Sequence, residues 1–139
     1  MTSILTPVLA LVCLSLLVLI WTYATRIPAI QKAGINPATA QEPTSLDALP
    51  IKVRQVGYNY NHLMEQPTIF YALVFYIQLS GHADALQIDL AWAYVALRVV
   101  HSLIQCTINV IMLRFAVFAL SSLVLLAMAG VEVFRVVGG

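Results

Sequence analysis

The stretch ILTPVLALVCLSLLVLIWTYA, residues 4–24, contains twenty-one consecutive uncharged and mostly apolar residues. A helix of about 20 such residues is long enough to cross the hydrocarbon core of a bilayer. The run is longer than the roughly 7–15 apolar residues of a secretory signal. No basic segment precedes it. This stretch is therefore predicted to remain in the protein as a membrane-spanning helix.

The composition of the whole chain agrees with a membrane protein. Of its 139 residues, 61% are hydrophobic and only 9% are charged. A soluble domain, by contrast, carries roughly 25% charged residues. The net charge of +1 and the absence of a Lys/Arg cluster exclude a nucleic-acid binder. The cysteines, Cys13 and Cys106, lie in apolar stretches, so we expect free thiols and neither a disulfide nor a metal site.

Three further apolar runs complete the predicted fold, which is an all-α membrane protein of one domain with four transmembrane helices in an antiparallel, up-down bundle. The predicted spans are residues 4–25, 59–80, 88–112 and 115–135. A polar, turn-rich connection at residues 26–57 follows the first span, whose end we place at Arg26 and Pro28. Gly81-His82-Ala83-Asp84 is predicted to form a short turn.

The basic residues predict the orientation of the chain in the membrane. Those in or beside the first connection are Arg26, Lys32, Lys52 and Arg54, whereas the second connection has none. Because connections rich in Lys and Arg stay in the cytoplasm, the first loop is predicted to be cytoplasmic. Arg114 at the third connection then lies on the same side, and both termini lie on the opposite side.

Polar residues form one stripe on each of the two middle helices. The intervals of three and four residues place Tyr94, Arg98, His101, Gln105 and Asn109 on one face of the third helix. If the second helix begins early, the residues that share one of its faces are Arg54, Tyr58, Asn61, Glu65 and Thr68. An unpaired polar group in hydrocarbon costs several kcal/mol, so the two stripes are expected to meet.

Two interpretations of these stripes stand side by side. In the first, Glu65 pairs with Arg98, His101 makes an interhelical hydrogen bond, and the stripes only hold the bundle together. In the second, Arg54 and Arg114 add positive charge that a single glutamate does not balance. An excess of arginine at membrane depth favours an anionic ligand, because the guanidinium fork matches a carboxylate.

The pattern of these residues resembles a known family. The second helix opens with Asn59, His62, Glu65 and Pro67, and the third carries Arg98-Val99-Val100-His101-Ser102, followed by Arg114. Together with four spans and a long first loop containing Asn36-Pro37, this resembles the MAPEG family, the membrane-associated proteins in eicosanoid and glutathione metabolism. The resemblance covers nearly the whole chain and is strongest to short bacterial members.

The resemblance implies a homotrimer in a lipid bilayer, the bacterial inner membrane, with glutathione as co-substrate between adjacent subunits near the cytoplasmic face. It also implies that Arg114 is the catalytic residue, whose cation stabilises the glutathione thiolate. The glutathione-binding residues that it implies are Arg54, Asn59, His62, Glu65, Arg98, His101 and Gln105. The sequence departs from the family where a tyrosine is replaced by Gln105, an asparagine by His62 and an arginine by Tyr58.

The leading hypothesis for function is a membrane-embedded, glutathione-dependent transferase or peroxidase that acts on an apolar electrophile. The alternative is a non-catalytic membrane protein of the same fold that binds lipid or another anion. A proton-coupled multidrug transporter is disfavoured, because the first helix has no carboxylate and Glu65 lies beside arginines that repel a cationic drug.

Overall fold

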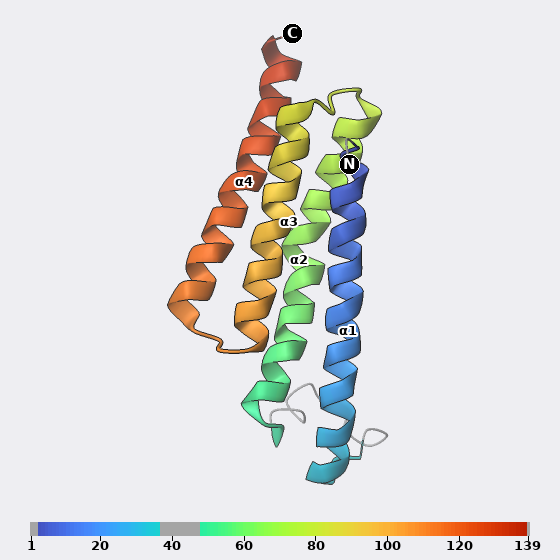
Figure 1. The fold of residues 1–139 in the computed structure, drawn as a ribbon, viewed down its shortest axis with the longest axis vertical. Coiled ribbons are helices and arrows are strands. Elements are labelled where there is room, and N and C mark those ends of the chain that lie inside the picture. The colour runs from blue at the N-terminus through green and yellow to red at the C-terminus, as the bar shows by residue number, and fades with distance from the viewer. Residues whose placement is uncertain (1–2, 37–47, 139) are drawn as a thin grey trace.

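The computed structural model describes residues 3–36 and 48–138, and within them the chain forms four helices that lie side by side (Figure 1). They are α1 (Leu5–Ala33), α2 (Ile51–Leu79), α3 (Ala85–Cys106) and α4 (Ile111–Gly138). Residues 80–84 join α2 to α3 at one end of the molecule, here called the α2–α3 end. Residues 107–110 join α3 to α4 at the opposite, α3–α4 end. The all-α prediction is confirmed for the described residues.

The first helix is longer than predicted. Its apolar sequence continues past Arg26, and Pro28 lies inside the helix. A proline removes one backbone hydrogen bond, but it does not by itself stop a helix whose flanking turns are well bonded. α1 ends at Gly34, whose φ of 71° lets its N–H reach the carbonyl of Gln31 while the N–H of Ile35 reaches that of Ile30.

Two other predicted boundaries also shift. α2 begins at Ile51, so the connection predicted at residues 26–57 is too long at both ends. The span predicted at residues 88–112 contains a helix end, because α3 stops at Cys106 and α4 starts at Ile111. Arg114 consequently lies in the first turn of α4 and not in a connection. The middle of the predicted first loop, residues 37–47 with Pro37, lies outside the described residues.

The turn at the α2–α3 end is the predicted one, and its residues explain its shape. Gly81 takes a φ of 75°, and the N–H of His82 reaches back to the carbonyl of Ile77 at 3.0 Å. This arrangement satisfies the last carbonyls of α2. Asp84 then caps α3, because its carboxylate accepts a hydrogen bond of 3.0 Å from the backbone N–H of Gln87.

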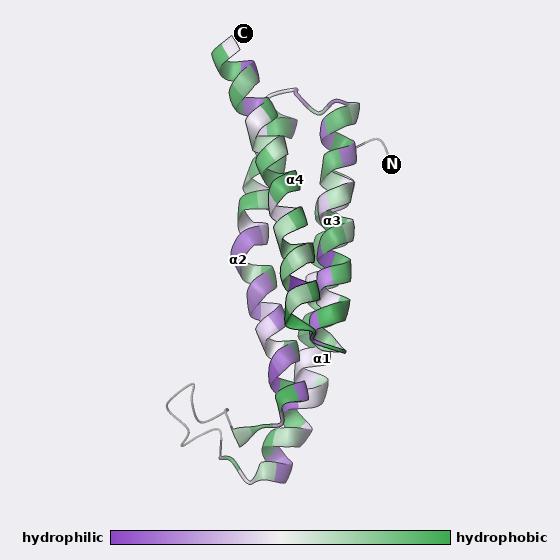
Figure 2. Ribbon diagram, turned by 90° about the vertical axis from the view of Figure 1, so that its left-hand side faces the viewer, coloured by the Kyte–Doolittle hydropathy of each residue, from purple (hydrophilic) through white to green (hydrophobic). Residues whose placement is uncertain are grey.

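Apolar side chains fill the centre of the bundle and also cover much of its outside. The buried core includes Leu11 of α1, Phe70 and Val74 of α2, Tyr94 of α3 and Met128 of α4. On the outer faces, α2 is interrupted by hydrophilic segments, whereas α4 is mostly hydrophobic (Figure 2). All four helices are long enough for a span, which requires about 20 residues. In the described residues, α1 and α4 each also contain a stretch apolar enough to cross a membrane.

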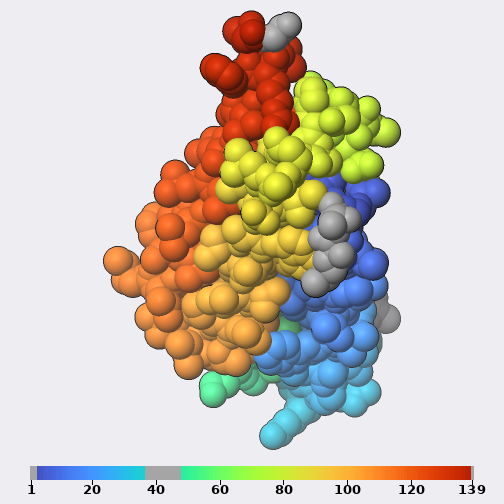
Figure 3. Space-filling view, turned by 45° about the horizontal axis from the view of Figure 1, so that its top comes forward, coloured from blue at the N-terminus to red at the C-terminus, as the bar shows by residue number. Residues whose placement is uncertain are grey.

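The helices do not pack equally closely. α1 packs mainly on α2, and α3 packs mainly on α4, whereas α2 and α4 meet at few positions. The last turns of α4 extend beyond the other helices at the α2–α3 end (Figures 1 and 3). The sparse contact between α2 and α4 leaves a groove between them, and the candidate site lies in it.

Candidate functional site

The polar stripe predicted on α3 faces the inside of the bundle. Tyr94, Arg98, His101 and Gln105 are all buried, with Arg98 and Tyr94 0% exposed. Asn109, the fifth predicted member, does not lie on α3, because the helix ends at Cys106. Sequence periodicity therefore identified four residues of the stripe correctly and extended it by one turn too many.

Arg98 is a buried cation that makes no hydrogen bond or ion pair with its side chain among the described residues. Its Nε and both Nη atoms are buried, and no group of the described residues accepts a hydrogen bond from them. Burying an ion costs several kcal/mol unless other groups compensate for its lost hydration. The predicted pair of Glu65 with Arg98 is not among the ion pairs of the described residues. Arg98 thus presents a set of donors directed at the interior of the bundle.

Other polar atoms on α2 and α3 are likewise buried and make no hydrogen bond within the described part of the chain. They are Asn59 Oδ1, His62 Nδ1, His101 Nδ1, Ser102 Oγ and Gln105 Oε1. Asn59 uses its amide nitrogen to donate to Cys106 Sγ at 3.4 Å. Cys106 and Cys13 are both free thiols, as predicted. The region between α2 and α3 therefore holds both donors and acceptors with unused hydrogen-bonding capacity.

A cleft of about 350 Å³ opens beside this cluster, toward the α3–α4 end. Its walls come from α2, α3 and α4, and its lining residues are His62, Glu65, His101, Ile111, Arg114, Phe115 and Phe118. We call it the arginine cleft. The ring centroids of His62 and His101 lie 5.1 Å apart, and the ring of Phe118 contacts His62 edge-on at 5.3 Å. The structure therefore brings four predicted site residues together in one cleft: His62, Glu65, His101 and Arg114.

A hydrogen bond to Asn109 holds Arg114 in the cleft, although helical spacing in the sequence placed Asn109 on the third helix. Its Nη1 donates to Asn109 Oδ1 at 2.8 Å. Asn109 has a φ of 49°, a left-handed conformation that asparagine tolerates better than most residues. A cation in the first turn of a helix opposes the helix dipole, so this position does not serve the stability of α4. Instead, Arg114 and the positive end of α4 direct positive potential into the arginine cleft.

The charges around the cleft act on the same two histidines. Arg98 and Arg114 both interact electrostatically with His62 and His101. Glu65 interacts electrostatically with His62 and with Arg98, but makes no ion pair with either among the described residues. The cleft is thus lined by one arginine, Arg114, and one exposed carboxylate, Glu65, while the buried Arg98 acts electrostatically on the same two histidines.

The two predicted stripes do not face each other, which corrects the sequence interpretation. On α2, Tyr58, Asn61, Glu65 and Thr68 are exposed, and Arg54 is half-buried. The α2 residues that contact or approach α3 and α4 form another row at the same helical spacing, namely Gln55, Asn59, His62 and Gln66. Gln55 donates to the Thr107 carbonyl at 3.1 Å. Gln55 and Gln66 were not identified from the sequence. Their helical spacing from Asn59 and His62 places them on the same face and could have identified them.

The close approach of Arg26 on α1 to Gly57 on α2 was also not identified from the sequence. Gly57 is buried, and a Cβ at this position would collide with Nη2 of Arg26. The absence of a side chain therefore lets the Arg26 guanidinium rest on the backbone of α2. Nε of Arg26 and Nε of Arg54 are both buried without a partner in the described residues. Arg54, a predicted site residue, does not line the arginine cleft.

The opposite, α2–α3 end carries a polar network in which the charged side chains are paired with one another. Glu132 is 3% exposed, and its carboxylate accepts from Gln87 Nε2 at 2.8 Å and contacts His82 Nδ1 at 2.6 Å. Arg135 donates to Glu132 at 3.0 Å and to the His82 carbonyl at 2.8 Å, and it pairs with Asp84. This network ties the end of α4 to the α2–α3 turn. Its ion pairs contrast with Arg98 and Arg114 near the arginine cleft, which have no ion-pair partner among the described residues.

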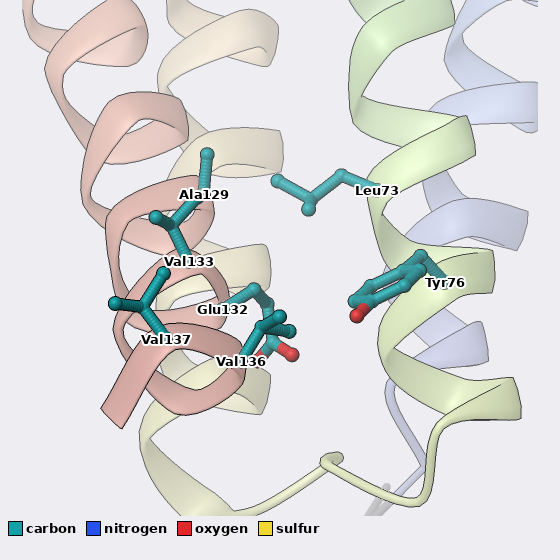
Figure 4. A pocket seen from close by; sticks show the side chains of 7 residues that line it. All are labelled: Leu73, Tyr76, Ala129, Glu132, Val133, Val136 and Val137. Atoms are coloured by element: carbon teal, nitrogen blue, oxygen red, sulfur yellow. The ribbon is translucent and has the colours of Figure 1, made fainter. Parts of the chain in front are cut away.

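A second hollow in the α2–α4 groove lies near this network. It has a volume of about 300 Å³, and its lining residues are Leu73, Tyr76, Ala129, Glu132, Val133, Val136 and Val137 (Figure 4). Leu73 and Tyr76 project from α2 toward the valines of α4 (Figure 4). We call it the apolar crevice. Its only charged lining residue, Glu132, is already engaged in the network.

Comparison with known proteins assigns the sequence to a family. The family model described as "MAPEG family" matches residues 4–134 of the chain. No curated protein and no solved structure matches the chain.

Proposed function

The chain belongs to the MAPEG family, a membrane family generally associated with glutathione, and from this we propose a function. We propose that the protein is a membrane-embedded, glutathione-dependent transferase or peroxidase acting on lipophilic electrophiles. The observation that carries this proposal is the pair of Arg98 and Arg114, which have no ion-pair partner in the described residues, beside a cleft of about 350 Å³. Such a volume lies at the lower end of the range typical of small-molecule sites, roughly 300–1,000 Å³.

The groups around the cleft match the functional groups of glutathione. That tripeptide carries two carboxylates, one ammonium and one thiol. The buried guanidinium of Arg98 supplies fork-like donors for a carboxylate, and the exposed carboxylate of Glu65 suits the ammonium. His101, Gln105 and Asn59 offer further hydrogen-bonding atoms, and we assign the second carboxylate to Arg54, which lies on α2 outside the cleft.

In this proposal Arg114 activates the thiol. Its cation and the N-terminal end of α4 stabilise a thiolate more than a thiol, which lowers the thiol pKa from its ordinary value of about 8.5. The thiolate sulfur then forms a bond to the electrophilic carbon of the second substrate, and for an aryl halide the carbon–halogen bond breaks and the halide leaves with its electron pair. Phe115 and Phe118 form an apolar wall of the cleft that can pack against this substrate. An apolar substrate can enter the cleft from the lipid.

We further propose that the site is completed by neighbouring subunits of a homotrimer. The row of Tyr58, Asn61, Glu65 and Thr68 is exposed on a helix that, in this proposal, crosses the membrane. Polar side chains at membrane depth face protein or water, because contact with lipid is costly. A second copy of the chain packed on this face of α2 satisfies that requirement.

The proposed setting is the bacterial inner membrane. All four helices cross it with alternating direction, and the arginine cleft lies near the cytoplasmic face. This orientation follows from the basic residues at the α3–α4 end and the adjacent first connection. The acidic residues Asp84 and Glu132 then lie toward the opposite face.

The direct test is conjugation of glutathione to a generic apolar aryl halide by purified protein in detergent. Arg114→Ala is expected to lower kcat/KM roughly 100-fold, a loss typical of removing one preorganised electrostatic contact. Lys32→Ala, which removes an exposed cation from the last turn of α1, is the matched control and should leave the rate unchanged. Equal rates for Arg114→Ala and the wild type would exclude the catalytic role.

The same arginines also fit a non-catalytic protein that binds an anionic lipid. The replacement of the family's tyrosine by Gln105 favours this second candidate, because it removes a hydroxyl next to the proposed thiol position. Thermal unfolding separates the two candidates. A Tm raised by glutathione supports the enzyme, whereas a Tm raised by anionic lipid but unchanged by glutathione supports the lipid-binding protein.

A further inference from the structure

A polar bridge crosses the α2–α4 groove between the arginine cleft and the apolar crevice. Gln66 Nε2 donates to Ser122 Oγ at 2.8 Å, and both side chains are half-buried. Among the described residues, it is the side-chain hydrogen bond that joins α2 to α4 in this groove. The bridge therefore lies where the two helices otherwise make few contacts.

Both sides of the bridge are fixed by further hydrogen bonds. Tyr94 donates from its hydroxyl to Gln66 Oε1 at 3.1 Å, and Ser122 donates to the Phe118 carbonyl at 2.9 Å. Tyr94 is itself fully buried and stacks on Phe70, with ring centroids 4.5 Å apart. Because each end of the Gln66 amide has a partner, the amide is held in one orientation across the groove.

The position of the bridge along α4 is set by helix geometry. Phe118 lines the arginine cleft, and Ala129 lines the apolar crevice. Phe118 precedes Ser122 by one helical turn, which corresponds to about 6 Å along the helix axis. Ala129 follows Ser122 by two turns, which corresponds to about 10 Å. The bridge thus stands at the inner end of the arginine cleft and separates it from the apolar crevice.

We propose that the Gln66–Ser122 bridge is a specificity determinant that limits how far an apolar substrate extends from the arginine cleft along the groove. This proposal rests on the proposed function. The favoured substrates are compact electrophiles whose apolar part ends at Phe118. A longer chain has to break hydrogen bonds in a low-dielectric environment, where the separated amide and hydroxyl find no replacement partners.

The test compares two substitutions of Gln66. Gln66→Ala removes both the hydrogen bonds and the bulk, and so joins the cleft to the apolar crevice. Gln66→Leu removes the hydrogen bonds but keeps an apolar side chain of similar length in the groove. If the bridge acts as a physical stop, only the alanine variant opens a path for longer chains.

The first readout is glutathione addition to 2-alkenals of six and twelve carbons. The thiolate sulfur bonds to the β-carbon, the π electrons move toward the carbonyl oxygen, and the α-carbon takes a proton from water. In Gln66→Ala, the ratio of kcat/KM for the longer to the shorter aldehyde should rise at least about tenfold, since two further buried methylenes already give a factor of that order. In Gln66→Leu, this ratio should stay near the wild-type value.

The second readout is binding without turnover, measured as the thermal shift caused by S-hexyl- and S-dodecylglutathione. The dodecyl compound should gain affinity over the hexyl compound only in Gln66→Ala. If all compounds still bind and Gln66→Ala has the same length preference as the wild type, the bridge does not limit substrate length, and the proposed function is unaffected. Failure of both compounds to bind the wild type overturns the proposed function itself, and the stop with it.

Discussion

The hydrogen bond between Asn109 and Arg114 is the contact that fixes the proposed catalytic cation. The acceptor comes from a connection residue with a φ of 49°, so its geometry depends on a backbone conformation that few side chains tolerate. A flexible arginine that is held in place loses less entropy when a ligand binds, which is the advantage of preorganisation.

Substitution of Asn109 separates the backbone contribution from the hydrogen bond. Asn109→Gly keeps the left-handed conformation and removes the acceptor, so kcat/KM for glutathione conjugation should fall, by less than in Arg114→Ala. Asn109→Asp keeps an acceptor in place and should retain most of the activity. Wild-type kcat/KM in Asn109→Gly would mean that Arg114 needs no such support.

The contact of Arg26 with Gly57 predicts a coupling between the two positions. Alanine is favoured over glycine in a helix interior by about 1 kcal/mol. Gly57→Ala should therefore raise the free energy of unfolding when Arg26 is also alanine. In the wild-type background the gain should shrink, because the guanidinium has to move away from α2.

Reversible unfolding in mixed detergent, measured for the four proteins of this double-mutant cycle, gives the coupling free energy. The same change at Gly57 in both backgrounds would contradict the close approach.

Sequence reasoning at the scale of single residues worked where helical spacing carried the information. Arg98, His101 and Gln105 were placed correctly on one buried face, because their intervals fit a helix that does extend that far. Asn109 was misplaced because the same spacing continued past the true end of α3. Gly57 gave no periodic signal, since its role depends on a side chain from another helix.

At the scale of elements, α2 shows how one helix can carry two polar faces. One face, with Asn59 and Gln66, meets α3 and α4, and the other, with Asn61 and Glu65, is exposed. Helical spacing predicted a polar face on α2, but the face predicted to meet α3 was the one with Asn61 and Glu65, which is exposed. Spacing identifies which residues share a face, whereas the rotation of a helix about its axis depends on packing against all its neighbours.

The cap of α3 predicts that the stability of the fold falls at low pH as Asp84 becomes protonated. The backbone N–H of Gln87 holds the pKa of Asp84 below its ordinary value, and Arg135 acts in the same direction. A carboxyl whose pKa is lowered by folding stabilises the fold above its unfolded pKa of about 3.9, and this stabilisation is lost as the pH falls through the folded pKa. Asp84→Asn keeps a capping oxygen but has no such titration.

The difference in Tm between wild type and Asp84→Asn should therefore be constant above about pH 5 and shrink as the pH falls below about 4. Scanning fluorimetry over that range measures it. A difference that persists unchanged to low pH would exclude Asp84 as the titrating group.

At the scale of the whole molecule, the described residues separate into two chemically distinct ends. At the α2–α3 end the carboxylates of Asp84 and Glu132 are paired with Arg135 and His82, whereas the described arginines near the α3–α4 end lack carboxylate partners. The first arrangement fastens helices together. The second leaves charge available for a ligand, and the groove between α2 and α4 connects the two ends.

The exposed polar face of α2 predicts the surface used for assembly. If the chain assembles as the proposed trimer, Asn61→Trp should shift it toward monomer in native mass spectrometry, because the indole is too large for a close helix contact. Leu17→Trp, on an α1 face that is 65% exposed at that residue, is the control and should leave the trimer intact. A trimer that persists in Asn61→Trp would place the assembly surface elsewhere.

The central claim is that Arg114 stabilises a glutathione thiolate in the arginine cleft. The most direct measurement is a pH titration of bound glutathione, followed by the ultraviolet absorbance of the thiolate, in the wild type and in Arg114→Ala. We predict a thiol pKa well below the ordinary value of about 8.5 in the wild type and a return toward that value in the variant. An equal thiol pKa in both proteins, with glutathione bound to each, would contradict the account.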